Sequence, residues 1–123
     1  MQNYRMSAAE YQTYINKQNK PSKYRNKKVE VDGHTFDSLL EAKRYEQLKI
    51  LKDAGEIKGF GLQPSFQLPG KIRYKADFIV SSTHGIWVED VKGIETQVFK
   101  NKKKLFEATY PWLPLKILTK SEI

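Results

Sequence analysis

Two neighbouring segments of alternating polar and apolar residues constrain the fold of this 123-residue chain most strongly. They span residues 72–81 and 86–92 and flank a short turn at residues 82–85. Alternation with a period of two is typical of strands, and a turn of this length predicts an antiparallel hairpin. If the turn is centred between residues 83 and 84, Asp77 faces Asp90 across the two strands, with Cβ atoms roughly 5 Å apart.

Two facing carboxylates inside a largely apolar hairpin repel each other unless a cation lies near them. Lys92 is two residues beyond Asp90 on the same predicted face, and a divalent metal would be a stronger counter-ion. A bulge at Gly85 would shift the register by one residue and make the pair diagonal. The alternative that needs no ligand is a partly exposed sheet face with a local Asp–Lys–Asp salt network.

The remaining segments complete the order helix, three strands, helix, strand, which predicts an α/β (α+β) fold with a sheet flanked by helices. Turn, cap and breaker residues bound each segment. The predicted elements are a hairpin at 29–36 around Asp32-Gly33, a helix at 38–54, strands at 57–62 and 66–68, a helix at 96–110 and a strand at 115–118.

The net charge of +8 is unevenly distributed along the chain. Residues 1–28 contain seven Lys and Arg and one acid, whereas residues 29–123 contain fifteen and thirteen. We therefore predict a basic N-terminal arm, residues 1–28, with a short helix from Ser7 to about Lys17, and a nearly neutral domain, residues 29–123. Such an arm contacts phosphates non-specifically or serves only as a solvated tail.

Composition excludes several classes of protein. The chain has no Cys, which excludes disulfides, thiolate zinc sites and Cys nucleophiles, and two His leave little room for a His-based metal cluster. No stretch approaches the ~18 apolar residues of a membrane span, and residues 1–10 contain no apolar signal-peptide core. We expect a soluble, cytoplasmic protein with no membrane partner, and a polyanion is the default partner for its charge.

One acid of the first predicted helix lies within its apolar face. Glu41 falls in angle among apolar side chains, where a carboxylate points at the core or at a cleft in it. The helix residues that define this face are Leu40, Tyr45, Leu48 and Leu51. Glu41 also ends the capping box Ser38-Leu39-Leu40-Glu41, so a helix cap is the alternative role.

The second predicted helix carries a run of lysines. Lys102 lies in the middle of an apolar stripe, with Lys100, Lys103 and Lys104 to its sides. The stripe consists of Val98, Phe99, Leu105, Phe106 and Thr109. A lysine on such a stripe snorkels to water or extends towards a phosphate, and a phosphate backbone would relieve the repulsion within the run.

These polar residues meet the needs of a metal-dependent phosphodiesterase. Mg²⁺ prefers hard oxygen ligands, mostly carboxylates and waters. The candidate ligands are the carboxylates of Asp77, Asp90 and Glu41 and the carbonyl of Val91. Lys92 is then available to orient or deprotonate the attacking water, or to stabilise the charge that develops on the phosphate.

Asp77, followed after a hairpin by Asp90-Val91-Lys92, resembles the bipartite motif of the PD-(D/E)XK nuclease superfamily. Ala76 stands where the motif has Pro, and Glu89 precedes Asp90, so strand parity must decide which acid is the ligand. A wider set resembles a family of small phage-encoded endonucleases over about residues 24–118. Its motifs are Lys27–Gly33, Phe36-Asp37-Ser38, Glu41-Ala42, Gln63-Pro64, Ala76-Asp77-Phe78, Val88–Gly93, Lys102–Phe106 and Tyr110-Pro111.

The resemblance implies a restriction-endonuclease-like α-β-β-β-α-β core with a mixed central sheet. It implies Asp77, Asp90 and Glu41 as metal ligands and Lys92 as the catalytic lysine. Mg²⁺ is the expected cofactor, with Mn²⁺ able to substitute, and DNA is the expected partner. The residues expected to contact DNA are Gln63, Lys100, Lys102, Lys103, Lys104, Lys23, Arg25, Lys27 and Lys28.

Our hypothesis from the sequence is therefore a Mg²⁺-dependent DNA endonuclease. The resemblance favours branched or structured DNA in phage recombination or replication, as for a Holliday junction resolvase, and a homodimer in the host cytoplasm. One alternative is a non-catalytic nucleic-acid-binding module that keeps the nuclease fold. Another is a nuclease subunit that needs a partner.

Overall fold

A computed structural model of the chain describes residues 7–9 and 27–123. Ala8 and Ala9 are helical, at the start of the short helix predicted from Ser7, and the rest of that helix lies outside the described residues. The chain forms two compact units, Met1–Glu46 and Gln47–Ile123, which we describe separately. Within the described part, no helix is long and apolar enough to cross a membrane.

The first unit contains the predicted Asp-Gly hairpin. Strands β1 (Val29–Val31) and β2 (His34–Phe36) pair antiparallel. The two turn residues, Asp32 and Gly33, have φ angles of 54° and 80°, the left-handed pair that a tight two-residue hairpin requires. Tyr45 of helix α2 (Leu39–Asp53) packs its ring 5.0 Å from that of Phe36 and donates a hydrogen bond to Asp32. The hairpin prediction is confirmed.

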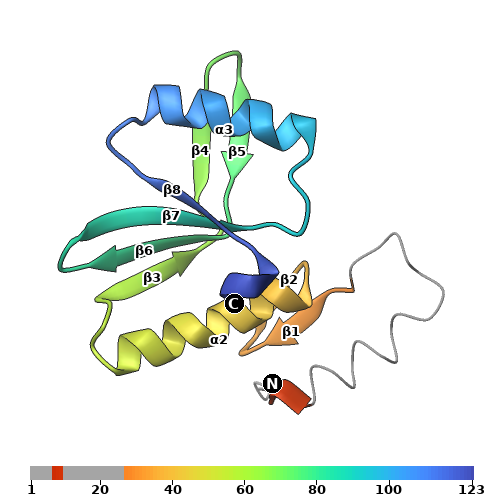
Figure 1. Ribbon diagram of the computed structural model, residues 1–123, viewed down its shortest axis with the longest axis vertical. Helices are drawn as coiled ribbons and strands as arrows, with labels where there is room; N and C mark the ends of the chain where they lie inside the picture. The colour runs from red at the N-terminus through yellow and green to blue at the C-terminus, as the bar shows by residue number, and fades with distance from the viewer. Residues whose placement is uncertain (1–6, 10–26) are drawn as a thin grey trace. The chain divides into compact units, whose positions relative to one another are not determined.

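The second unit is built on a mixed four-stranded sheet of order β3-β6-β7-β8 (Figure 1). The strands are β3 (Gly59–Leu62), β6 (Phe78–Ser82), β7 (Gly85–Val91) and β8 (Leu115–Leu118). The first three pair antiparallel, and β8 runs parallel to β7 after the crossover helix α3 (Gln97–Thr109). The predicted α/β fold class is confirmed.

The segment 72–81, predicted as one strand, is two. β5 (Ile72–Lys75) pairs with β4 (Ser65–Leu68) in a separate two-stranded sheet, and β6 begins only at Phe78. The amide of Ala76 donates to the Pro64 carbonyl, whereas that of Asp77 donates to Glu89, so the chain changes its partner between these residues. Alternation continues through the break and therefore does not reveal it. The strand predicted at 57–62 likewise begins later, at Gly59.

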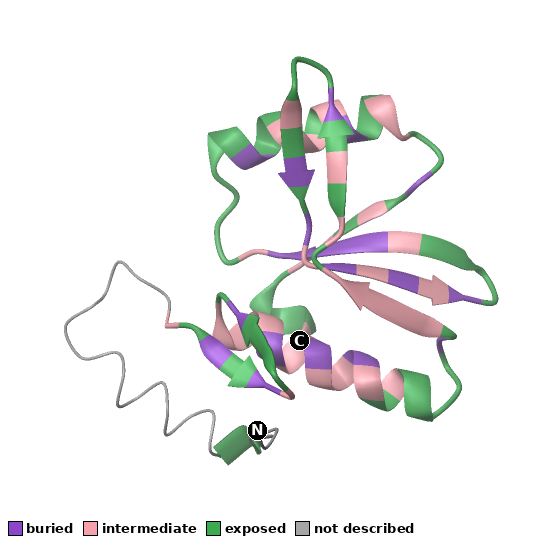
Figure 2. Ribbon diagram, turned by 180° about the vertical axis from the view of Figure 1, so that it is seen from behind, coloured by how far each residue is buried: buried purple, intermediate pink, exposed green. Residues whose placement is uncertain are grey.

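The core of the second unit lies where α3 crosses the β4–β5 hairpin (Figure 1). Phe106 of α3 contacts the rings of Phe66 and Tyr74 at 5.0 and 5.6 Å between centroids. Strand β7 runs from an exposed start into this core, and all its residues from Val88 to Val91 are buried (Figure 2). The deepest part of the sheet therefore contains two acids, Glu89 and Asp90.

Candidate active site

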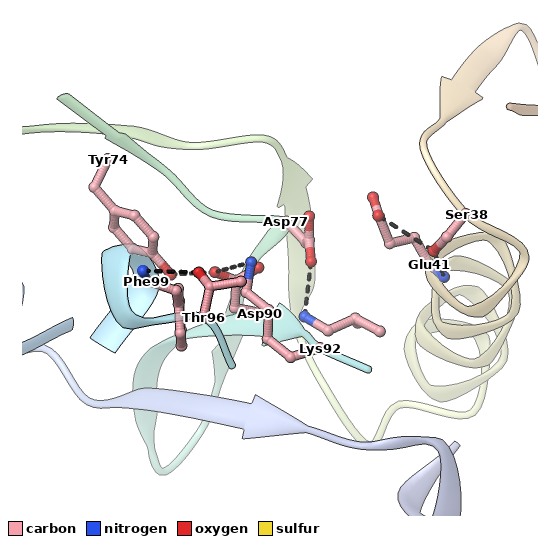
Figure 3. Close-up of polar contacts among 9 residues, drawn as sticks. Ser38, Glu41, Tyr74, Asp77, Asp90, Lys92, Thr96 and Phe99 are labelled. Carbon is pink, nitrogen blue, oxygen red and sulfur yellow. Dashed lines mark hydrogen bonds and ion pairs between the residues drawn. The ribbon is translucent and has the colours of Figure 1, made fainter. Parts of the chain in front are cut away.

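Asp90 is a buried acid with two partners. Its carboxylate is 1% exposed, near the end of β7, and its Oδ2 atom accepts a hydrogen bond from the hydroxyl of Tyr74 (Figure 3). The same oxygen lies 3.7 Å from Nζ of Lys92. A buried charge is costly unless it is paired and hydrogen-bonded, and Asp90 has both a cation and a donor.

Lys92 is held through its backbone amide and through its ammonium. Its amide donates to the Leu118 carbonyl at 3.0 Å, which continues the pairing of β7 with β8. Its ammonium lies 4.4 Å from the centroid of the Phe99 ring, a cation–π distance. Lys92 directly follows β7 and its ammonium reaches Asp90, so the two side chains lie on the same side of the chain, as strand parity predicts.

Glu89 is buried on the other face of β7. Its Oε2 accepts a hydrogen bond of 2.9 Å from the indole nitrogen of Trp87. The ring of Trp87 in turn carries Nζ of Lys116 at 4.0 Å from its centroid. The two adjacent acids thus point to opposite faces of the strand, and Asp90 is the one that forms the ion pair with Lys92.

The side chain of Asp77 contacts the backbone of Val91, next to Asp90. The predicted register is confirmed from Ser82↔Gly85 to Phe78↔Glu89. The expectation of a directly facing Asp77–Asp90 pair is wrong, because the Asp77 amide donates to Glu89 and so steps out of that register. Its Oδ2 accepts a hydrogen bond of 2.7 Å from the amide of Val91, between Asp90 and Lys92 (Figure 3).

Gln63 lies at the end of β3 beside this segment. Its amide donates to the carbonyl of Asp77 at 2.9 Å, and its φ of 49° turns the chain away from the sheet. Its side chain is exposed. The structure therefore brings Gln63, Asp77, Asp90, Val91 and Lys92 together at one end of the sheet.

Glu41 belongs to the first unit, where it lies in the first turn of α2. Its amide donates to Ser38 Oγ at 3.1 Å, and the Ser38 hydroxyl lies 3.3 Å from Glu41 Oε2. Ser38 thus caps α2 by accepting from the Glu41 amide, while the predicted hydrogen bond between the Glu41 carboxylate and the Ser38 amide and the ligand role both stay predictions. In the same unit Lys28 forms an ion pair with Asp37 at 2.6 Å, and this hydrogen bond raises the pKa of Lys28. Lys27 is half-buried, and Lys23 and Arg25 lie outside the described residues.

The lysines of α3 divide into two groups. Lys100, Lys103 and Lys104 line a surface hollow of about 330 Å³ together with Glu95 and Gln97. Lys102 is half-buried on the helix face of the buried Phe99 and Phe106, as the stripe predicts. Val98 does not belong to that stripe, because it is 65% exposed.

Tyr74 is the site residue that the sequence does not reveal. It reads as an ordinary apolar residue of an alternating strand, yet its hydroxyl reaches the Asp90 carboxylate. Burial, followed by the neighbouring charge of Asp90, raises the pKa of Tyr74 above the ordinary range. The phenol therefore stays protonated and remains a hydrogen-bond donor.

The candidate metal ligands near Val91 are all hard oxygen atoms. Among the described residues no group of three or more His, Cys, Asp and Glu is arranged to hold a metal ion. Asp77 nevertheless contacts the Val91 amide, and Asp90 precedes Val91 in the chain, so two carboxylates lie near the Val91 backbone. Two carboxylates completed by a carbonyl and waters are a set that Mg²⁺ accepts, so the donor chemistry fits that ion.

Comparison with known families gives one match. A family model described as "Protein of unknown function (DUF1064)" matches residues 21–122, a range that includes Asp77, Asp90 and Lys92. No curated protein matches the chain.

Proposed function

The chain belongs to the DUF1064 family of proteins of unknown function, and we propose that it is a Mg²⁺-dependent DNA endonuclease. One observation carries the proposal: the buried Asp90 carboxylate contacts the Lys92 ammonium, two residues away, at the point where Asp77 binds the intervening Val91 amide. A sheet end that needed only stability would be served better by apolar side chains, because buried ion pairs contribute little net free energy. Two acids and a lysine placed together in this way favour a catalytic role.

Asp77, Asp90 and the Val91 carbonyl would hold Mg²⁺, which when bound lowers the pKa of a coordinated water and offsets the charge of the phosphate. Lys92 acts beside them. Its ammonium, held by Asp90 and the Phe99 ring, donates a hydrogen bond to a phosphate oxygen as negative charge develops there.

The reaction is a hydrolysis and needs no redox partner. The water oxygen forms a bond to phosphorus and loses a proton to solvent, while the bond from phosphorus to the sugar oxygen of the leaving strand breaks. The leaving oxygen takes a proton from solvent. Lys92 stabilises this step and is itself unchanged at the end of it.

The lysines of α3 support DNA as the substrate. Lys100, Lys103 and Lys104 line one hollow with Glu95, and Lys103 also pairs with Glu107 at 3.4 Å, so the hollow keeps a net positive charge that suits a phosphate backbone. Hydrogen bonds to phosphates carry no sequence information, which favours recognition of DNA shape over reading of bases. The resemblance to small phage-encoded endonucleases extends the proposal to branched DNA as the preferred substrate, a homodimer as the active form and the cytoplasm as its location.

The test uses the purified full chain with a four-way junction, a single strand and a linear duplex, each with Mg²⁺ or EDTA. We expect cutting of the junction that requires Mg²⁺ and is also supported by Mn²⁺. No metal-dependent cutting of any of the three substrates would contradict the proposal.

A further inference from the structure

The β4–β5 hairpin lies outside the four-stranded sheet, yet one of its residues reaches the site. Within residues 27–123, strands β4 and β5 pair only with each other, and they lie between β3 and β6 in the chain. Arg73 joins the two strands through hydrogen bonds to Ser65 and Gln67, at 3.1 and 2.9 Å. The hairpin is therefore a separate element, held together by its own hydrogen bonds. Its side chains also contact residues outside the hairpin.

The hairpin contacts helix α3 and the carboxylate of Asp90. Phe66 packs on Phe106, and the hydroxyl of Tyr110, at the end of α3, donates to the Gln67 carbonyl at 2.8 Å. Tyr74, which is 3% exposed, lies among these rings and ends at the Asp90 carboxylate. The aromatic cluster therefore fixes the ring of Tyr74, and the ring fixes the direction of its hydroxyl.

We propose that Tyr74 is a positioning residue that orients Asp90 for metal binding, an inference that rests on the proposed function. Tyr74 and Lys92 both contact Oδ2 of Asp90, so the carboxylate is held through one oxygen. A carboxylate has two oxygens, and one held in this way still offers Oδ1 to a ligand. The hydroxyl thereby does for Asp90 what outer-shell donors do for metal-binding carboxylates in general.

The alternative is that the Asp90 carboxylate merely satisfies a buried phenol. Tyr110 supplies the matched control, because it belongs to the same aromatic cluster and its hydroxyl donates to a backbone carbonyl. Tyr74→Phe and Tyr110→Phe each remove one hydrogen-bonded hydroxyl and keep the ring. Only the first removes a donor to Asp90.

The experiment measures Mn²⁺ binding to the full chain by electron paramagnetic resonance, with near-ultraviolet circular dichroism to confirm that each variant is folded. We expect Tyr74→Phe to weaken Mn²⁺ binding roughly 10- to 100-fold, the range for removal of outer-shell donors. We expect Tyr110→Phe to bind within about threefold of the unsubstituted protein, since it leaves both carboxylates and their partners intact.

Three other results would contradict the positioning role of Tyr74 or the proposed metal site. Tyr74→Phe that binds Mn²⁺ like the unsubstituted protein refutes the positioning role and leaves the proposed function standing. An equal loss of Mn²⁺ binding in both variants also refutes it, because the effect then belongs to the aromatic cluster. No Mn²⁺ binding by the unsubstituted protein refutes the proposed metal site, and the role of Tyr74 with it.

Discussion

The ammonium of Lys92 lies 3.7 Å from Oδ2 of Asp90 at the buried end of β7. Strand geometry favours this approach, because residues two apart on a strand lie on the same face. Phe99 holds the ammonium from α3, and Tyr74 reaches the same carboxylate oxygen from β5. Three elements thus converge on one pair of charges, and substitutions of these residues test what the pair does.

Asp90 and Glu89 are adjacent buried acids, and we assign chemistry to Asp90 alone. Asp90→Asn keeps an acceptor for the Tyr74 hydroxyl and removes the charge, so we expect DNA cutting to fall by at least about 100-fold. Glu89→Gln keeps an acceptor for Trp87 and is expected to cut within about threefold of the unsubstituted protein. Single-turnover cleavage rates measure both. The reverse order would show that Glu89 is the ligand.

Lys92, directly after β7, and Lys116, on β8, each hold the ammonium over an aromatic ring. Lys92→Met keeps the apolar stem and removes the charge, so we expect cutting to drop about 100- to 10,000-fold while DNA binding changes little. Lys116→Met is the control and should leave the rate nearly unchanged. Electrophoretic mobility shifts measure binding in parallel. A Lys92→Met protein that cuts normally would remove this lysine from the mechanism.

The lysine hollow of α3 is expected to bind the DNA backbone. Replacement of Lys100, Lys103 and Lys104 by Gln should weaken binding and reduce the slope of log affinity against log salt by about 2 to 3, because each phosphate that a lysine neutralises contributes about 0.9 to that slope. The charge-matched control replaces three other exposed lysines, Lys52, Lys58 and Lys120. Fluorescence anisotropy at several salt concentrations gives both slopes. Equal slopes would mean that the hollow contributes only net charge.

The cap of α2 separates the two roles predicted for Glu41. Ser38→Ala removes the acceptor of the Glu41 amide and should cost about 1 kcal/mol in the free energy of unfolding. Glu41→Gln keeps the capping-box pattern and should change stability by less than about 0.5 kcal/mol. Urea unfolding measures both. If Glu41→Gln stays stable but no longer cuts DNA, the carboxylate has the ligand role that the sequence predicts.

Tyr74 gives the fold a specific sensitivity to alkali. Burial raises the pKa of its phenol above the ordinary value of 10.0, so the folded state favours the neutral form. The stability from this protonated phenol is fully present below the ordinary pKa and is lost as pH rises through the raised one. Between about pH 9 and pH 11 the metal-free protein should lose stability more steeply than its Tyr74→Phe variant. Parallel urea-unfolding profiles for the two proteins would contradict this.

The sequence predicts the pairing of the sheet strands far better than the point at which the chain leaves β5 and enters the sheet. Turn residues and alternation predict the β6–β7 register, because a one-residue slip would move every side chain of a strand to the opposite face of the sheet. The same alternation hides the change of partner between Ala76 and Asp77, because β5 and β6 alternate in phase. The position of Asp77 therefore depends on a backbone step that periodicity does not record.

In the candidate site, too, local relationships can be predicted from the sequence and long-range contacts cannot. Parity along one strand predicts that Lys92 shares a face with Asp90 and not with Glu89, since this relationship is local. The contact of Tyr74 with Asp90 joins residues 16 positions apart through a hairpin that packs on α3. Such a contact arises from tertiary packing, and an apolar-looking Tyr in an alternating strand gives no local sign of it.

The central claim is that Asp90 supports metal-dependent cutting of DNA. The most direct measurement is the single-turnover cleavage of a four-way junction at saturating protein, with and without Mg²⁺, for the unsubstituted chain and Asp90→Asn. We predict cleavage only by the unsubstituted chain with Mg²⁺, while both proteins bind the junction. Equal cleavage by the two proteins, or none by either, would contradict the claim.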